Sequence, residues 1–262
     1  MFDALYIGAT GMRAQQTQVD TVANNVANLN TNGYRRGVVS FEDMTAALTP
    51  MGTDPILQAV RSTLATVRGA GAYAINTLST TAGPLTQTSQ PLDIAINGNG
   101  FIEVTRADGT PAYTRAGSLE INSDGQLALA DGTPLAGRFV FPTDMTSVQI
   151  NSDGKVYAVV TGQTSPVEVG QIQLANFANP AALQSIGTNL YVATPDSGEA
   201  KTGIPSEQGL GTIQQGWLET SNVQLVEELT SMMVAQRGFE LNGRVVQAAD
   251  QMMAITNSLY RT

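Results

Sequence analysis

The chain contains neither cysteine nor histidine among its 262 residues. Their absence excludes disulfide bonds, a thiolate nucleophile, a zinc site built from these residues and a Ser-His-Asp relay. Any catalysis would therefore have to use carboxylate, lysine or tyrosine side chains. A chain without thiols can also enter an oxidising compartment without forming wrong disulfides.

Charged and aromatic side chains are scarce as well. Only 13% of the residues are charged, against about 25% in an average soluble domain. The 13 basic and 22 acidic residues give a formal net charge of -9, which disfavours a phosphate backbone, so we expect no nucleic-acid partner. One tryptophan, seven tyrosines and seven phenylalanines do not indicate the aromatic groove of a sugar-binding enzyme.

Long apolar runs are also missing. No stretch approaches the roughly 18 apolar residues of a membrane helix, so we expect no membrane insertion. The start Met1-Phe2-Asp3 has no basic segment before an apolar one, and this pattern predicts no cleaved signal peptide.

The first 30 residues carry an apolar heptad pattern, which is typical of helices that pack on other helices. We predict a long helix ended by Asn32-Gly33, two residues that tolerate a left-handed backbone. Its predicted assembly interface comprises Leu5, Met12, Val19, Val22, Val26 and Leu29.

The last 40 residues carry a cleaner heptad pattern. A continuous helix from Leu225 to Tyr260 would be roughly 50 Å long, and Ser221 with Gln224 is a candidate capping box. Its predicted assembly interface comprises Leu225, Met232, Phe239, Val246, Met253 and Tyr260. Small residues three positions further on, at Ala235, Asn242, Ala249 and Thr256, would let a partner helix come close.

Between these ends the apolar period changes to two, which indicates half-buried antiparallel strands. Turn signals such as Asp124-Gly125 and Asp153-Gly154 separate them. Ile121–Gly125 recurs in sequence as Ile150–Gly154, which predicts two hairpin turns of one type. The acidic turns lack the flanking helices and the glutamate of a calcium-binding loop, so we expect no metal. We also expect no cofactor and no catalytic residues.

These patterns predict an α+β fold in which long N- and C-terminal helices pair as a coiled coil and a central all-β antiparallel domain is inserted between them. We divide the chain into residues 1–36 (N-terminal helix), 37–90 (a connection with extended and short helical parts), 91–218 (β domain) and 219–262 (C-terminal helix). The middle carries seven basic and fifteen acidic residues, so most of the net charge belongs to it.

Four motifs, in order along the chain, resemble those of the bacterial flagellar rod and hook proteins. They are Ala23–Arg36, Leu92–Phe101 and Tyr113–Gly117, and a C-terminal signature made of Glu219–Val223, Glu227–Leu229 and Gln236–Asn242. The motif residues singled out are Asn24, Asn25, Asn28, Thr31, Gly33, Tyr34, Ser221, Asn222, Val223, Gln236, Arg237 and Glu240. The length and the Glu219–Val223 motif resemble the family's distal rod members; proximal rod and hook-type members are the alternatives.

The resemblance implies a non-enzymatic subunit of the basal-body rod, polymerising helically into a hollow rigid shaft that transmits torque to the hook and conducts exported subunits. It implies export by the flagellar type III apparatus into a rod that spans the periplasm. The implied partners are other copies, the proximal rod proteins, the hook protein and the ring proteins around the rod. The alternative from a different class is an extracellular acidic β-domain adhesin or enzyme, in which the terminal helices would only pack on the domain.

Overall fold

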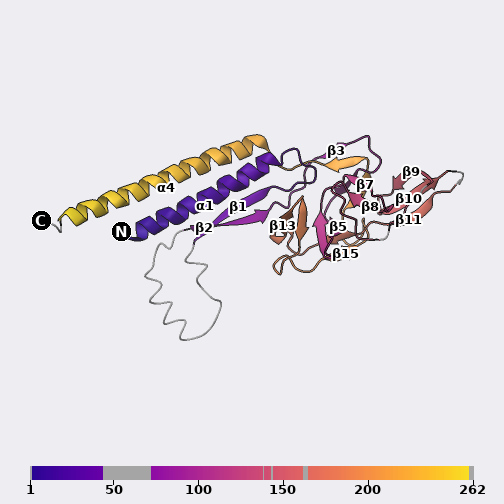
Figure 1. Ribbon diagram of the computed structural model, residues 1–262, viewed down its shortest axis with the longest axis horizontal. Coiled ribbons are helices and arrows are strands. Elements are labelled where there is room, and N and C mark those ends of the chain that lie inside the picture. Colours follow the sequence, from indigo (N-terminus) through magenta and orange to yellow (C-terminus); the bar gives the residue numbers. More distant parts are fainter. Residues whose placement is uncertain (1, 44–71, 138, 143, 162–164, 260–262) are drawn as a thin grey trace, which may run out of the picture. The chain divides into compact units, whose positions relative to one another are not determined.

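The computed structural model describes residues 2–43, 72–137, 139–142, 144–161 and 165–259 (Figure 1). The chain divides into two compact units. Unit 1 comprises Met1–Ala27, Gly37–Thr77 and Gln224–Thr262, and unit 2 comprises Asn28–Arg36 and Leu78–Val223. Of the predicted connection at residues 37–90, residues 44–71 lie outside the described residues.

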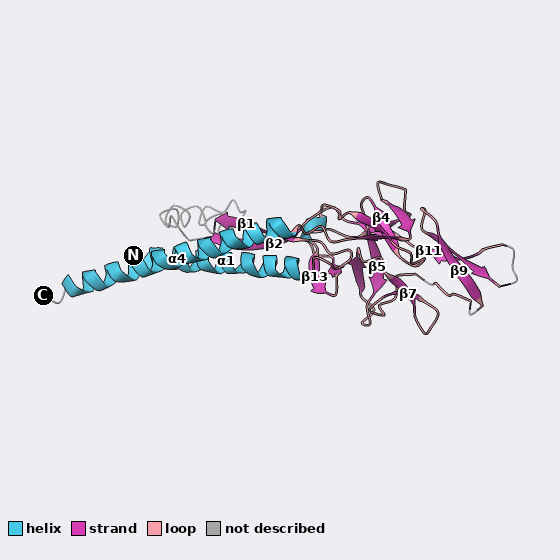
Figure 2. Ribbon diagram, turned by 90° about the horizontal axis from the view of Figure 1, so that it is seen from above, coloured by secondary structure: helices cyan, strands magenta, loops and turns pink. Residues whose placement is uncertain are grey.

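Unit 1 contains the two long helices, α1 (Phe2–Ala27) and α4 (Leu225–Leu259). It also contains β1 (Gly37–Asp43) and β2 (Ala72–Leu78), which form a two-stranded sheet. The helices lie side by side in Figures 1 and 2, and α1 also contacts β1. One face of α1 is therefore covered by a helix and another by a strand.

Small residues set the close approach of α1 and α4. A Cβ atom added to Gly8 would lie 2.6 Å from a methyl group of Val246, and one on Gly11 would lie 2.8 Å from the Asn242 amide. On α4, Ala235 and Ala249 are fully buried. The prediction that this row of small residues admits a partner helix is confirmed at these positions, and the partner is α1 of the same chain.

The two helices run antiparallel, with a buried polar contact near the end of α1 and the start of α4. The Asn25 amide donates to a Glu228 carboxylate oxygen at 3.1 Å and to the Gly37 carbonyl at 2.9 Å. Its oxygen accepts from the Gly37 N–H at 2.9 Å. Because buried polar groups are costly without partners, this contact favours one register of α1, β1 and α4.

The predicted end of the first helix is wrong. Helix α1 ends at Ala27 rather than at Asn32-Gly33, and Thr31 hydrogen-bonds to Asn28 through both its N–H and its hydroxyl. Asparagine and threonine side chains compete with helical hydrogen bonds in this way. Helix α4 begins at Leu225, as predicted, but the predicted Ser221 capping box does not form; the Ser221 hydroxyl accepts from the Val223 N–H instead.

Unit 2 is built from short strands that pair in antiparallel fashion. A six-stranded sheet has the order β13-β14-β6-β5-β12-β15, a three-stranded sheet the order β11-β10-β9, and three pairs are β16-β4, β17-β3 and β7-β8. The bounds are β3 Leu85–Gln87, β4 Ile94–Asn97, β5 Phe101–Thr105, β6 Pro111–Thr114, β7 Leu119–Ile121, β8 Leu127–Leu129, β9 Met145–Ile150, β10 Lys155–Val160, β11 Val167–Gln171, β12 Leu174–Asn176, β13 Gln184–Gly187, β14 Leu190–Val192, β15 Lys201–Gly203, β16 Thr212–Gln215 and β17 Trp217–Glu219, with a 3-10 turn at Pro180–Ala182.

The repeated pentapeptide forms two equivalent hairpin turns, as predicted. In each, a glycine N–H donates to the asparagine carbonyl three residues earlier at 3.0 Å, in the pairs Gly125–Asn122 and Gly154–Asn151. Both glycines have positive φ, 69° and 81°, which glycine adopts without strain.

The core of unit 2 consists of two clusters. The larger is aliphatic, with two phenylalanines, and includes Ile94, Leu127, Ile172 and Leu174, each at most 1% exposed. The smaller is aromatic: Phe101, Tyr113 and Phe177 make edge-to-face ring contacts. The fold class is thus confirmed as α+β with N- and C-terminal helices and a central antiparallel β region.

Candidate functional site

The predicted interface of α1 is largely covered within the chain. Val22 is buried, and Leu5, Met12, Val19 and Val26 are half-buried. Leu29 lies beyond the end of the helix and is half-buried in unit 2. These residues therefore retain only part of their surface for another molecule.

The predicted interface of α4 is more exposed. Phe239 is 44% exposed and Leu225 43%, while Met232, Val246 and Met253 are half-buried. Tyr260 lies outside the described residues. Ala235 and Ala249 of the small-residue row are more deeply buried than this apolar row, from which Val246 also faces Gly8 of α1.

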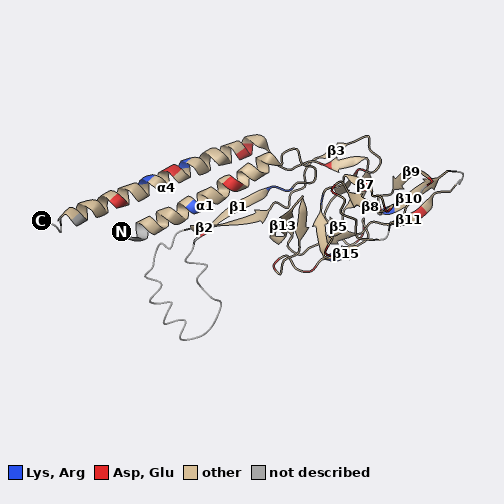
Figure 3. Ribbon diagram, viewed as in Figure 1, with Lys and Arg blue, Asp and Glu red and all other residues tan. Residues whose placement is uncertain are grey.

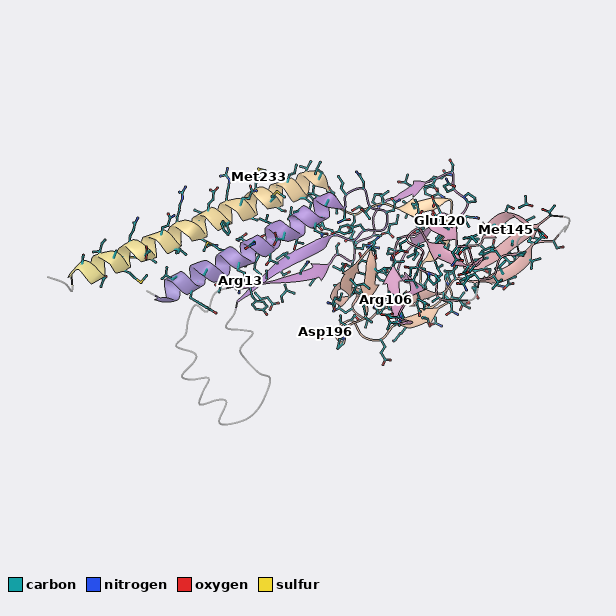
Figure 4. All side chains as sticks on the ribbon, in the orientation of Figure 1. Arg13, Arg106, Glu120, Met145, Asp196 and Met233 are labelled. Carbon is teal, nitrogen blue, oxygen red and sulfur yellow. The ribbon has the colours of Figure 1, made fainter. Side chains whose placement is uncertain are left out.

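A second set of apolar side chains on α4 is exposed away from α1. Met233, labelled in Figure 4, stands on the outer edge of the helix and is 56% exposed. Val226, Val234, Leu241, Val245, Met252 and Ile255 are each about half exposed or more. Charged side chains are few and dispersed on both helices (Figure 3). Apolar surface of this extent on a helix is typical of a protein interface.

A groove of about 450 Å³ lies between the two helices. It is lined by Gln16 and Val19 from α1 and by Gln236, Phe239 and Glu240 from α4. Two motif residues, Gln236 and Glu240, thus flank an exposed phenylalanine of the predicted interface. Arg237, the third motif residue of this turn, is exposed.

The N-terminal motif residues have different environments. Asn25 forms the buried contact with Glu228, whereas Asn24 is exposed. Asn28, Thr31 and Tyr34 are half-buried in unit 2. Gly33 has a φ of 71°, and a Cβ there would lie 2.5 Å from the Arg115 backbone, so the position requires glycine.

The C-terminal motif Ser221–Val223 connects two segments of unit 2. The Asn222 side chain accepts from the Arg36 N–H at 2.7 Å and donates to the Thr81 carbonyl at 2.9 Å. Ser221 and Val223 are buried. This motif therefore holds residues 28–36 against residues 78–83.

Three charged residues form a buried triad in unit 2 that was not singled out as a site from the sequence. Glu219 lies between Arg35, at 2.9 Å, and Arg115, at 3.2 Å. A carboxylate oxygen of Glu219 also accepts from the Gly83 N–H, and its carbonyl accepts from the Gly33 N–H. Each triad residue belongs to one of the quoted motifs. Because charged residues are rare in this chain, their presence inside these motifs was the sequence signal that could have indicated the triad.

Burial shapes the electrostatics of this triad. Desolvation lowers the pKa of Arg115 to about 10, although Glu219 acts in the opposite direction. Desolvation also lowers the pKa of Arg35, again against the attraction of Glu219. Arg115 lies 5.3 Å from the centre of the Phe101 ring, which adds a favourable cation–π contact.

Within the described part of the chain, no group of three or more aspartates and glutamates could hold a metal ion. None of the described helices is both long and apolar enough to cross a membrane.

Comparison with known proteins places these features in a family. Residues 5–35 match the family described as "Flagella basal body rod protein", residues 95–158 the "Flagellar hook protein FlgE/F/G D1 domain", and residues 214–259 the "Flagellar basal body rod FlgEFG protein C-terminal". The flagellar basal-body rod protein FlgG of Borreliella burgdorferi is 38% identical over 100% of both chains. The chain belongs to the flagellar basal-body rod protein family. FlgG of Agrobacterium fabrum is 38% identical over 97% of this chain and 98% of the relative.

Membership makes this chain a structural subunit of the flagellar basal-body rod and not an enzyme. A third relative, FlgG of Buchnera aphidicola subsp. Baizongia pistaciae, is 39% identical over 97% of this chain and 98% of its own. The N-terminal match covers most of α1 and the C-terminal match all of α4, each with an adjoining segment of unit 2, and the central match lies in unit 2.

Proposed function

We propose that this subunit forms the distal part of the rod, where copies stack helically into a hollow, rigid shaft. The shaft would transmit motor torque to the hook and conduct exported subunits. Full-length similarity to FlgG proteins supports this assignment. The partners would be further copies, the proximal rod proteins below, the hook protein above and the ring proteins around the rod.

The observation that carries the proposal is the exposed apolar surface of α4. Two of its predicted interface residues, Leu225 and Phe239, are 43% and 44% exposed, and its outer edge carries further exposed apolar side chains. Covering the exposed half of one such side chain contributes roughly 1 kcal/mol. Single contacts of this size are weak, but they add up when several neighbours surround one subunit. A head-to-tail contact between copies whose rotation does not close into a ring generates a helical assembly.

We propose that the interface and motif residues predicted in the two terminal segments act in assembly. The contact residues would be Leu5, Met12, Val19, Val22, Val26, Leu29, Leu225, Met232, Phe239, Val246, Met253 and Tyr260. The heptad spacing favours supercoiled packing of the two helices. In the proposed division, residues 1–36 and 219–262 act as the helical part, 37–90 as the connection and 91–218 as the β domain. We further propose export by the flagellar type III apparatus, without a cleaved signal, into a rod that spans the periplasm.

Replacing Phe239 tests this role. Phe239→Asp puts a charge where the proposed assembly buries a ring, at a cost of several kcal/mol, so tubes should not form. Phe239→Leu keeps the site apolar and should assemble. Electron microscopy of the concentrated full-length variants gives the readout, with circular dichroism to verify that both retain their helices. Tubes of normal form from a helical Phe239→Asp chain would refute the assembly role of this surface.

A further inference from the structure

A second feature of unit 2 is a cavity beside the buried triad, with a volume of about 220 Å³. Both Arg35 and Arg115 line it, together with the polar residues Ser79, Thr80, Asn99 and Asn176 and five apolar or glycine residues. None of the described residues that line it is acidic.

The triad leaves one positive charge unbalanced. It combines two guanidinium groups with one carboxylate, and the side chains of Arg35, Glu219 and Arg115 are exposed by only 2%, 1% and 4%. A buried charge without a counter-charge is unfavourable. An anion in the adjoining cavity would complete the charge balance.

Hydrogen-bond donors are also in excess. A guanidinium carries five N–H donors. Arg35 donates to the carbonyls of Thr80 and Thr81 and to Glu219. Arg115 donates to the carbonyls of Ile96 and Gly98 and to Glu219. The Nε–H of each arginine is buried and has no partner in the described part of the chain.

We infer that this cavity binds a single carboxylate or an oxyanion of similar size. A water molecule takes about 30 Å³ in the liquid, so the cavity has room for such a group together with a few waters. The anion would be held near two guanidinium groups and the polar side chains of Ser79, Asn99 and Asn176. The site lies within unit 2 and does not depend on the proposed polymerisation.

A carboxylate introduced at Ser79 should occupy the site. Ser79 is half-buried, and its backbone N–H donates to the Arg36 carbonyl, a bond that substitutions preserve. Ser79→Asp adds the predicted negative charge, whereas Ser79→Asn has nearly the same size without the charge. We expect the Asp variant to unfold at a higher temperature than the Asn variant.

Thermal unfolding of the full chain, followed through the fluorescence of Trp217, provides the measurement, because Trp217 is the one tryptophan and lies on β17 of unit 2. Sodium chloride is replaced by acetate or phosphate at constant ionic strength. Wild type and Ser79→Asn should show a saturable rise in unfolding temperature, and Ser79→Asp should show none. No saturable rise in wild type, or an equal rise in Ser79→Asp, would overturn the site.

The same variants identify the source of the anion. If an aspartate or glutamate of a neighbouring copy enters the cavity, Ser79→Asp should assemble less readily than Ser79→Asn. If a free anion occupies it, the two variants should assemble alike. Both results are compatible with the site, and failure of all variants to assemble would affect the proposed function alone, because the fluorescence measurement uses the unassembled chain.

Discussion

At the scale of single residues, the most consequential group is the Arg35–Glu219–Arg115 triad. It brings together residues from three motifs that are far apart in the sequence. Breaking a buried ion pair leaves an uncompensated charge, which generally costs more than the pair gains. The triad therefore holds three distant segments of unit 2 together, and loss of one member should destabilise the whole unit.

Glu219→Gln should lower the free energy of unfolding of unit 2 by about 3–5 kcal/mol, because it leaves two buried guanidinium groups without their carboxylate. Denaturant titration with Trp217 fluorescence measures this, while ellipticity at 222 nm, dominated by α1 and α4, should keep its midpoint. Asp108→Asn is the matched control, since Asp108 forms an exposed pair with Arg106 and its loss should cost at most about 1 kcal/mol. Equal losses of unfolding free energy in the two variants would show that the buried triad contributes no more to stability than an exposed ion pair.

Glu103 makes a pH-dependent contribution to the stability of the folded chain. It is half-buried on β5 opposite Tyr113, and desolvation raises its pKa. The folded chain then binds more protons than the unfolded chain between the ordinary and the raised pKa, so this contribution to stability falls as the pH rises through that window.

Glu103→Gln should remove that dependence. The free energy of unfolding of both proteins is measured with denaturant at about pH 4 and about pH 7. The difference, wild type minus variant, should be smaller at the higher pH. A difference between the two proteins that stays constant, or that changes in the opposite direction, would contradict the assignment to Glu103.

At the scale of elements, the packing of α1 on α4 explains both what the sequence predicted and what it did not. The heptad spacing identified the two rows on α4; in the small-residue row Ala235 and Ala249 are buried, and Asn242 and Thr256 are half-buried. The half-exposure of Phe239 was not predictable, because periodicity does not tell which row lies at the centre of a contact. The early end of α1 depended on local bonds of Thr31 to Asn28, and the triad depended on contacts between distant segments, which spacing alone does not reveal.

Two glycines in these helices offer a matched pair of substitutions. Alanine favours a helix over glycine by about 1 kcal/mol. Gly243→Ala should gain this stability, because nothing lies within 4 Å of its new Cβ. At Gly8 the new Cβ would meet a Val246 methyl at 2.6 Å, and a valine in a helix has little freedom to move away. Urea unfolding monitored at 222 nm should show a stabilised Gly243→Ala and a destabilised Gly8→Ala; equal gains would mean that the helices do not pack as described.

At the scale of the whole molecule, the account is that of a rod subunit in which a β unit and a helical unit have different tasks. Unit 2 has its own cores and its own buried triad. Unit 1 has the exposed apolar surface that we assign to contacts between copies. Most of the net negative charge belongs to residues 37–218, which agrees with this division of tasks.

The most direct test uses the absence of cysteine in the chain. A single cysteine at Phe239 and, separately, one at the exposed turn residue Ser123 can be reacted with a maleimide before and after polymerisation. We predict that assembly strongly slows the reaction at position 239, while the reaction at position 123 provides the reference for overall accessibility. Labelling at position 239 that proceeds equally fast in free chains and in tubes would contradict the claim that α4 is an assembly surface.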